Sequence, residues 1–118
     1  MAENKEYITL PSDKGTINVS EDVVAYVAGN AVNDTEGVAS VGKDSGEIWG
    51  MKPAQKGVRV INEGETVRIE VSVMAKAGAS VHKLGTDVQE AVTGALESIC
   101  GVKVSEVNVH VLGVQLSK

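Results

Sequence analysis

Large aromatic side chains are almost absent from this chain of 118 residues, which contains no Phe, one Trp and two Tyr. Valine, alanine and isoleucine must therefore fill the interior, which predicts a thin, strand-rich core. The chain also has a single cysteine, Cys100, so an internal disulfide and a site with several cysteine ligands are excluded. We expect Cys100 to be a small buried hydrophobe at the end of a helix.

Long apolar runs and a secretory leader are missing too. No run approaches the roughly 18 residues that cross a bilayer, and the first six residues, MAENKE, are polar. These absences predict a cytoplasmic protein without direct membrane insertion, which would be peripheral to a membrane only through a partner. Basic charge is also in deficit, because the formal net charge is −5. The charge argues against nucleic acid and against docking on anionic lipid.

Sequence motifs of catalysis are lacking as well. The glycines are dispersed, so neither a phosphate-binding loop nor a dinucleotide fingerprint is present. No serine lies in a nucleophile elbow, and Cys100 has no evident base. The two histidines, His82 and His110, fall on different predicted elements. The sequence therefore predicts a protein that is not an enzyme and has no catalytic residues, no metal and no cofactor.

The clearest positive signal is an amphipathic pattern in the last third of the chain. It predicts a helix over residues 80–100, whose start is left open between Ser80 and Thr86. A valine-rich strand follows the helix, and the slip of its alternation at Gly113 predicts a β-bulge. The predicted apolar stripe of the helix consists of Val81, Leu84, Val88, Val92, Ala95, Leu96 and Ile99.

Earlier segments predict a half-buried strand at 15–19, a helix capped by Ser20, and a strand at 38–41. A β-hairpin is predicted from residues 58–61 and 66–75. The order β-α-β-β-β-α-β predicts a two-layer α+β sandwich with two helices on one face of a mixed sheet. Residues 1–14 are assigned to a polar N-terminal arm and residues 15–118 to a single domain. Within the arm, Tyr7–Leu10 is left open between a short strand and a loose segment.

Two surfaces are candidate partner-binding sites. The first is an irregular loop over residues 42–57, which either folds back onto the core or exposes an apolar anchor. The second is the polar face of the sheet, which is either simply solvated or used for docking. The candidate residues are Ile48, Trp49 and Met51 in the loop, and Arg68, Met74, Asn108, His110 and Leu112 on the sheet, whose polar face also carries Glu70 and Ser72.

Four segments, in this order and spacing, carry a resemblance to a known family: GTINVSEDVV from Gly15, TEGV from Thr35, KGVRV from Lys56 and GVKVSEVNVHVLGV from Gly101. With them, the chain from residue 15 to residue 116 resembles the bacterial alkaline shock proteins, also called Gls-type general stress proteins. The chain departs from the family at residues 43–55, where relatives often have a shorter, glycine-rich stretch.

The resemblance implies a non-enzymatic, cytosolic stress-response protein, linked to cell-envelope homeostasis and acting by protein–protein interaction. Some relatives are held at the membrane by a separate membrane-spanning protein, so the resemblance implies a membrane-anchored protein partner. Self-association through one of the two candidate surfaces is a separate expectation. Others are associated with lipid metabolism. The alternative is therefore a binder of fatty-acyl or lipid-like ligands, or a regulator of lipid metabolism. An RNA-binding module is a third reading. The family has no agreed catalytic site, so no functional residue is carried over.

Overall fold

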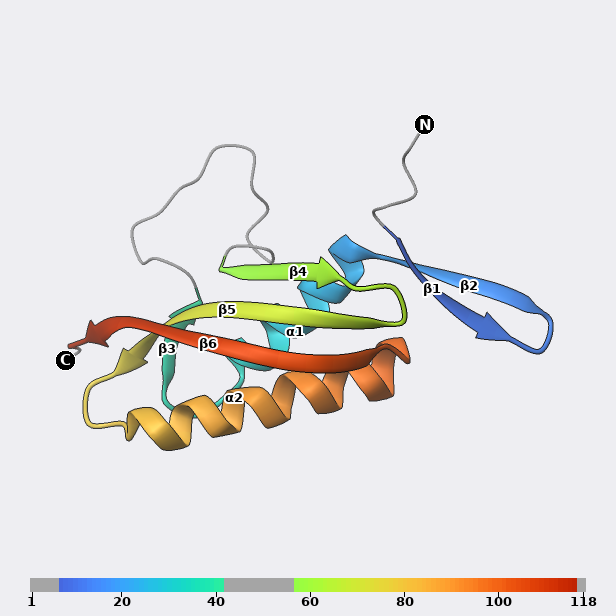
Figure 1. Cartoon of the computed structure of the whole chain (residues 1–118). Coiled ribbons are helices and arrows are strands. Elements are labelled where there is room, and N and C mark those ends of the chain that lie inside the picture. Colours follow the sequence, from blue (N-terminus) through green and yellow to red (C-terminus); the bar gives the residue numbers. More distant parts are fainter. Residues whose placement is uncertain (1–6, 42–56, 117–118) are drawn as a thin grey trace.

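The computed structural model describes residues 7–41 and 57–116, which form two helices beside a four-stranded sheet and a separate two-stranded hairpin (Figure 1). The loop candidates Ile48, Trp49 and Met51 lie outside the described residues. In chain order the elements are β1 (Tyr7–Ser12), β2 (Gly15–Ser20), α1 (Glu21–Asn33), β3 (Val38–Val41), β4 (Val58–Asn62), β5 (Thr66–Lys76), α2 (Val81–Ala95), the π-helical turn η3 (Leu96–Cys100) and β6 (Lys103–Gln115).

Strand β5 is the centre of the four-stranded sheet. β6 runs parallel along one side of it, and β3 and β4 both run antiparallel along the other. Val41, at the end of β3, lies opposite Val73, while Val58, at the start of β4, lies opposite Val71. β3 and β4 therefore lie end to end along the same edge of β5. The predicted mixed sheet is confirmed.

The core lies between this sheet and the helices. Every second side chain of β5, from Val67 to Ala75, points to the helices and is at most 1% exposed. Strict alternation over 11 residues is what a strand with one buried face requires. Both helices lie on the same side of the sheet (Figure 1), which confirms the predicted α+β sandwich.

Helix α1 begins where the sequence predicts, after Ser20. The Ser20 hydroxyl accepts a hydrogen bond from the Asp22 amide at 3.0 Å, which satisfies one of the free amides of the first turn. The apolar residues Val24, Ala28 and Val32 are fully buried against the sheet. Gly37 follows with a φ of +96°, a conformation that favours glycine, and leads the chain into β3.

Helix α2 begins at the first of its two predicted starts, because Ser80 accepts from the Lys83 amide at 3.3 Å and caps the helix. Its buried stripe consists of Leu84, Val88, Val92 and Leu96. Two residues of the predicted stripe are wrongly assigned, since Val81 is 51% and Ile99 69% exposed.

Ile99 is exposed because of the turn η3. A π-helical turn holds more residues than an α-helical one, so it rotates Ile99 away from the core and leaves Cys100 half-buried. Val81 is the first residue of α2, beyond the buried stripe. No helix among the described residues is long and apolar enough to span a membrane.

The N-terminal strands depart from the prediction for residues 15–19. β2 forms, but it pairs with β1 rather than with the main sheet, from Tyr7 opposite Ser20 to Ser12 opposite Gly15. Tyr7–Leu10 is thus a strand, one of the two alternatives. β2 is mostly exposed rather than half-buried, because nothing among the described residues covers the outer part of this hairpin.

Candidate functional site

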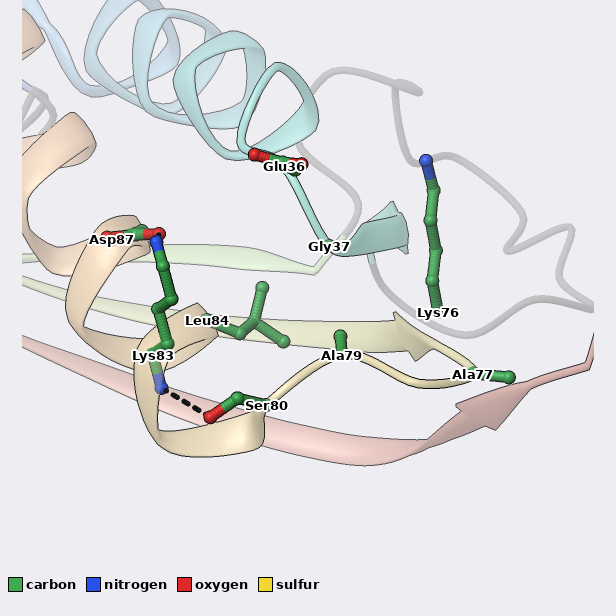
Figure 2. A pocket seen from close by; sticks show the side chains of 9 residues that line it. All are labelled: Glu36, Gly37, Lys76, Ala77, Ala79, Ser80, Lys83, Leu84 and Asp87. Carbon is green, nitrogen blue, oxygen red and sulfur yellow. Dashed lines mark hydrogen bonds and ion pairs between the residues drawn. The ribbon is translucent and has the colours of Figure 1, made fainter.

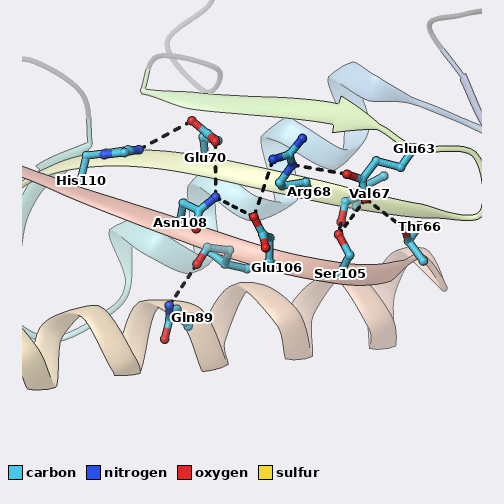
Figure 3. Close-up of polar contacts among 11 residues, drawn as sticks. Glu63, Thr66, Val67, Arg68, Glu70, Gln89, Ser105, Glu106, Asn108 and His110 are labelled. Carbon is cyan, nitrogen blue, oxygen red and sulfur yellow. Dashed lines mark hydrogen bonds and ion pairs between the residues drawn. The ribbon is translucent and has the colours of Figure 1, made fainter.

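The face of the sheet opposite the helices carries a connected set of polar contacts (Figure 3). At one end, Arg68 on β5 forms two ion pairs. Its Nε lies 3.3 Å from a Glu63 carboxylate oxygen, in the β4–β5 turn, and its Nη1 lies 3.7 Å from Glu106 on β6. The register explains the second contact, because Arg68 and Glu106 are direct partners in the β5–β6 ladder.

Asn108 links the next two carboxylates. Its Nδ2 donates to Glu106 Oε2 at 3.1 Å and to Glu70 Oε2 at 3.3 Å. Farther along, Nε2 of His110 lies 3.6 Å from Glu70 Oε1, an ion pair only when the imidazole is protonated. We call the residues Glu63, Arg68, Glu70, Glu106, Asn108 and His110 the polar ladder.

The polar ladder is fixed at its Glu63 end by two hydroxyls. Ser105 Oγ donates to Glu63 Oε1 at 2.8 Å, and Thr66 Oγ1 lies 3.3 Å from the same oxygen. The arginine, glutamate and histidine side chains of the ladder are 30% to 54% exposed, so water reaches all of them. Such exposed pairs contribute only about 0–1 kcal/mol each to stability. Their arrangement therefore matters more for what can dock on this face than for holding the fold.

The structure brings three of the predicted site residues together, namely Arg68, Asn108 and His110. Met74 is on the same strand as Arg68, and its side chain lies next to Gly113, where an added Cβ would be 3.2 Å from the Met74 methyl. Leu112 is the extra residue of the predicted bulge, because Val111 opposes Val73 while Gly113 opposes Met74. The bulge at Gly113 is confirmed, and Leu112 is 49% exposed without a direct partner on β5.

Two members of the polar ladder were missed by the sequence interpretation. Glu106 has the same parity as Asn108 and His110, so the alternation of β6 places it on the same face. Glu63 is in a turn, where alternation gives no information. Opposite charges could have indicated the Arg68–Glu106 pair, because aligning β5 and β6 as parallel strands places these two residues opposite one another.

A second feature is a surface hollow of about 340 Å³ at the start of α2 (Figure 2). Its floor includes Leu84 and Ala79, and charged residues stand at its rim. Lys83 Nζ lies 2.7 Å from Asp87 Oδ2, and this hydrogen bond, together with the charge of Asp87, raises the pKa of Lys83. The lysine therefore stays protonated and is already paired.

The groove between the two helices continues this hollow. It has a volume of about 520 Å³ and shares Glu36 and Asp87 with the first hollow. Asp34 and Glu90 also line it, so the groove is acidic. No histidine is among the described lining residues, and the Thr35 hydroxyl donates to the Ala31 carbonyl at 2.8 Å, so the geometry offers no acid–base pair with a defined reaction.

Two further sources of chemistry would be a group of metal-binding side chains and a pair of histidines, and neither is present in the described ranges, 7–41 and 57–116. No group of three or more His, Cys, Asp or Glu residues there is arranged to hold a metal ion. The two histidines remain on separate elements, His82 in the first turn of α2 and His110 on β6. The expectation that the protein is not an enzyme stays a prediction.

Comparison with known proteins agrees with the resemblance. A sequence model of the alkaline shock protein 23 family, described as having a cell envelope-related function, matches residues 9–116. The uncharacterized protein YloU of Bacillus subtilis (strain 168) is 28% identical over 116 residues, which cover 93% of this chain and 97% of YloU. The uncharacterized protein YqhY of the same organism is 27% identical over 105 residues, covering 86% of this chain and 78% of YqhY.

Among solved structures, a variant of MamM-CTD superposes with a TM-score of 0.51 and 13% sequence identity. The match covers 84% of this chain and 100% of that chain. At this level of identity the likeness concerns the fold alone, and it agrees with the α+β arrangement of the strands and helices.

Proposed function

Because the chain belongs to the alkaline shock protein 23 family, whose function is related to the cell envelope, we propose that it acts there as a non-enzymatic interaction protein. It binds a protein partner through the open face of its sheet, as part of the cytoplasmic response to envelope stress. A membrane-anchored partner would bring it to the membrane. The polar ladder is the observation that supports this proposal.

The ladder is suited to docking because its side chains are held in place before a partner arrives. Arg68 is fixed by Glu63 and Glu106, and Asn108 by Glu106 and Glu70. Groups that are already ordered lose little conformational entropy when they are covered, so binding is less costly. Three carboxylates against one guanidinium leave the ladder with an excess of negative charge. A partner with basic side chains flanking a polar centre fits this pattern.

The alternatives have less support in the described part of the chain. A lipid-like ligand requires an apolar cavity, whereas the hollow beside Leu84 has Lys83 and Asp87 at its rim. An RNA module requires a basic surface, and the ladder is acidic on balance. Both alternatives stay predictions, without an observation that favours them.

The test is site-specific photo-crosslinking in the native host, with p-benzoylphenylalanine at position 108 or, as a control, at position 90 on the helix side. We expect a protein adduct of defined mass from position 108 and none of that mass from position 90. Mass spectrometry of the adduct identifies the partner. No adduct from position 108, or equal adducts from both positions, contradicts the proposal.

A charge-reversal variant tests the role of the ladder itself. Glu70→Lys with Glu106→Lys should reduce recovery of the crosslinked partner at least tenfold, because basic side chains of the partner would then meet positive charge on this face. The matched control, Glu90→Lys with Glu97→Lys, changes the same number of acidic side chains on the helix side and should leave recovery unchanged. Thermal melting of both variants establishes that the fold is intact.

A further inference from the structure

The unpaired edges of the two sheets differ in how they are protected. Natural proteins guard exposed strand edges with proline, charge, short strands or a covering element. The free edge of β6 has α2 beside it, and Gln89 Nε2 donates to the carbonyl of Val107 at 3.0 Å (Figure 3). β3 and β4 have only four and five residues. β1 contains Pro11, which has no N–H to offer another strand.

Strand β2 has none of these protections. Its six residues, GTINVS, include no charged residue and no proline. Thr16, Ile17 and Asn18 are all exposed. The hairpin projects beyond the end of the main sheet (Figure 1), so neither helix of the described residues lies along this edge. An uncharged, β-branched edge in this position is ready to pair with another strand.

The apolar side of the hairpin is only half covered. Ile8 and Val19 oppose one another at its base, where Ile8 is fully buried. Leu10 and Ile17 form the next pair on the same side, and Ile17 is 54% exposed. A hairpin of two strands is marginally stable in water, and three or more strands are needed for a sheet that holds on its own. An additional strand on β2 would supply what this hairpin lacks.

We infer that β2 pairs antiparallel with β2 of a second copy of this chain, about a twofold axis at Ile17. Ile17 then opposes the partner's Ile17, and an apolar row runs across four strands with Leu10 at each end. On the other side Thr16 opposes the partner's Asn18, so a hydroxyl meets an amide. The strand is complementary to itself because it brings no charge to the axis.

The geometry favours a second copy of this chain over another protein as the partner of the β2 edge. The two hairpins overlap while pointing in opposite directions, so the two bodies lie at opposite ends and do not collide. The net charge of −5 opposes association elsewhere on the surface, but the β2 edge is uncharged. Only the five residues 15–19 of each β2 pair across this axis, which buries less than a standard interface, so the association is weak and depends on concentration. It does not use the polar ladder, and it holds or fails independently of the proposed function.

Disulfide trapping tests the axis. Three single variants, Ile17→Cys, Thr16→Cys and Asn18→Cys, are made in the full chain carrying Cys100→Ser. Residues directly opposite in antiparallel strands have Cα atoms about 4.5–5.5 Å apart, which a disulfide can bridge. Diagonal neighbours are about 7–8 Å apart, which is too far. We expect rapid dimer formation for Ile17→Cys and at least tenfold slower formation for the other two. Faster trapping at either neighbour, equal trapping at all three, or none overturns the inference.

Sedimentation velocity tests the association without a crosslink. The unmodified chain should show a reversible monomer–dimer equilibrium between about 10 μM and 1 mM, the range of weak contacts. Ile17→Lys places two ammonium groups at the axis and should weaken the dimer at least tenfold. Ile99→Lys, the same change at a more exposed isoleucine, should leave the dimer unchanged. A monomer at all concentrations, or equal effects of both variants, contradicts the pairing. If a host protein copurifies with the chain and accounts for the larger species, β2 pairs with a strand of that protein, and the inference of self-pairing is overturned.

Discussion

The side-chain amide of Asn62 donates a hydrogen bond to the carbonyl of Tyr7 at 2.9 Å, across 55 positions of sequence. The same side chain accepts from the Gly64 amide at 3.0 Å, so it also shapes the β4–β5 turn. Asn62 thus joins the N-terminal hairpin to the main sheet.

We predict that Asn62→Ala lowers the free energy of unfolding by about 1–2 kcal/mol, because two hydrogen bonds are lost at a half-buried position. Asn62→Asp keeps the acceptor for Gly64 but loses the donor to Tyr7, and should cost less. Urea denaturation measures both. Hydrogen exchange should show faster exchange in β1 for both variants, and unchanged protection there would contradict the role of this contact.

The turn η3 yields a second prediction, because it separates two residues that an unbroken α-helix would place on one face. Leu96 is fully buried while Ile99 is 69% exposed. Leu96→Ala should lower the free energy of unfolding by about 2–5 kcal/mol, from lost burial and the cavity left behind. Ile99→Ala should change it by less than about 0.5 kcal/mol. Chemical denaturation of the two variants compares them, and equal losses would mean that the helix continues without a π-turn.

The single thiol provides a prediction about pH. Burial raises the pKa of the Cys100 thiol, because the thiolate is less well solvated there than in water. A higher pKa means less thiolate at neutral pH, and the thiolate is the reactive form. The rate of alkylation by iodoacetamide should therefore rise at a higher pH in the folded protein than in the urea-unfolded chain. Coincident pH profiles, or a profile shifted to lower pH in the folded protein, would contradict it.

The sequence was sufficient for the elements whose pattern is local. The Ser20 cap defines where α1 begins, since a side-chain oxygen there satisfies free amides, whereas the pattern left Ser80 and Thr86 as alternative starts of α2. The clean alternation of β5 identifies its buried face, and the slip at Gly113 reveals the bulge. These features depend on residues that are neighbours in the chain.

Other features depend on contacts that no local pattern reports. Alternation over 15–19 predicts a strand, but it does not say which sheet the strand joins, and β2 pairs with β1 alone. The exposure of Ile99 follows from a π-turn that the 3.6-residue period does not contain. Glu63 enters the polar ladder from a turn, through the pairing of β4 with β5.

The alignment of β3 and β4 along β5 bears on how this protein can vary. Val41 and Val58 face positions of β5 only two residues apart, a separation of about 7 Å along a strand. Whatever joins them has both its ends anchored at nearly one point, and closing a longer connection adds only about 0.6 kcal/mol for each doubling of its length. We therefore expect the connection between β3 and β4 to tolerate substitutions and insertions, while both strands keep their pairing with β5.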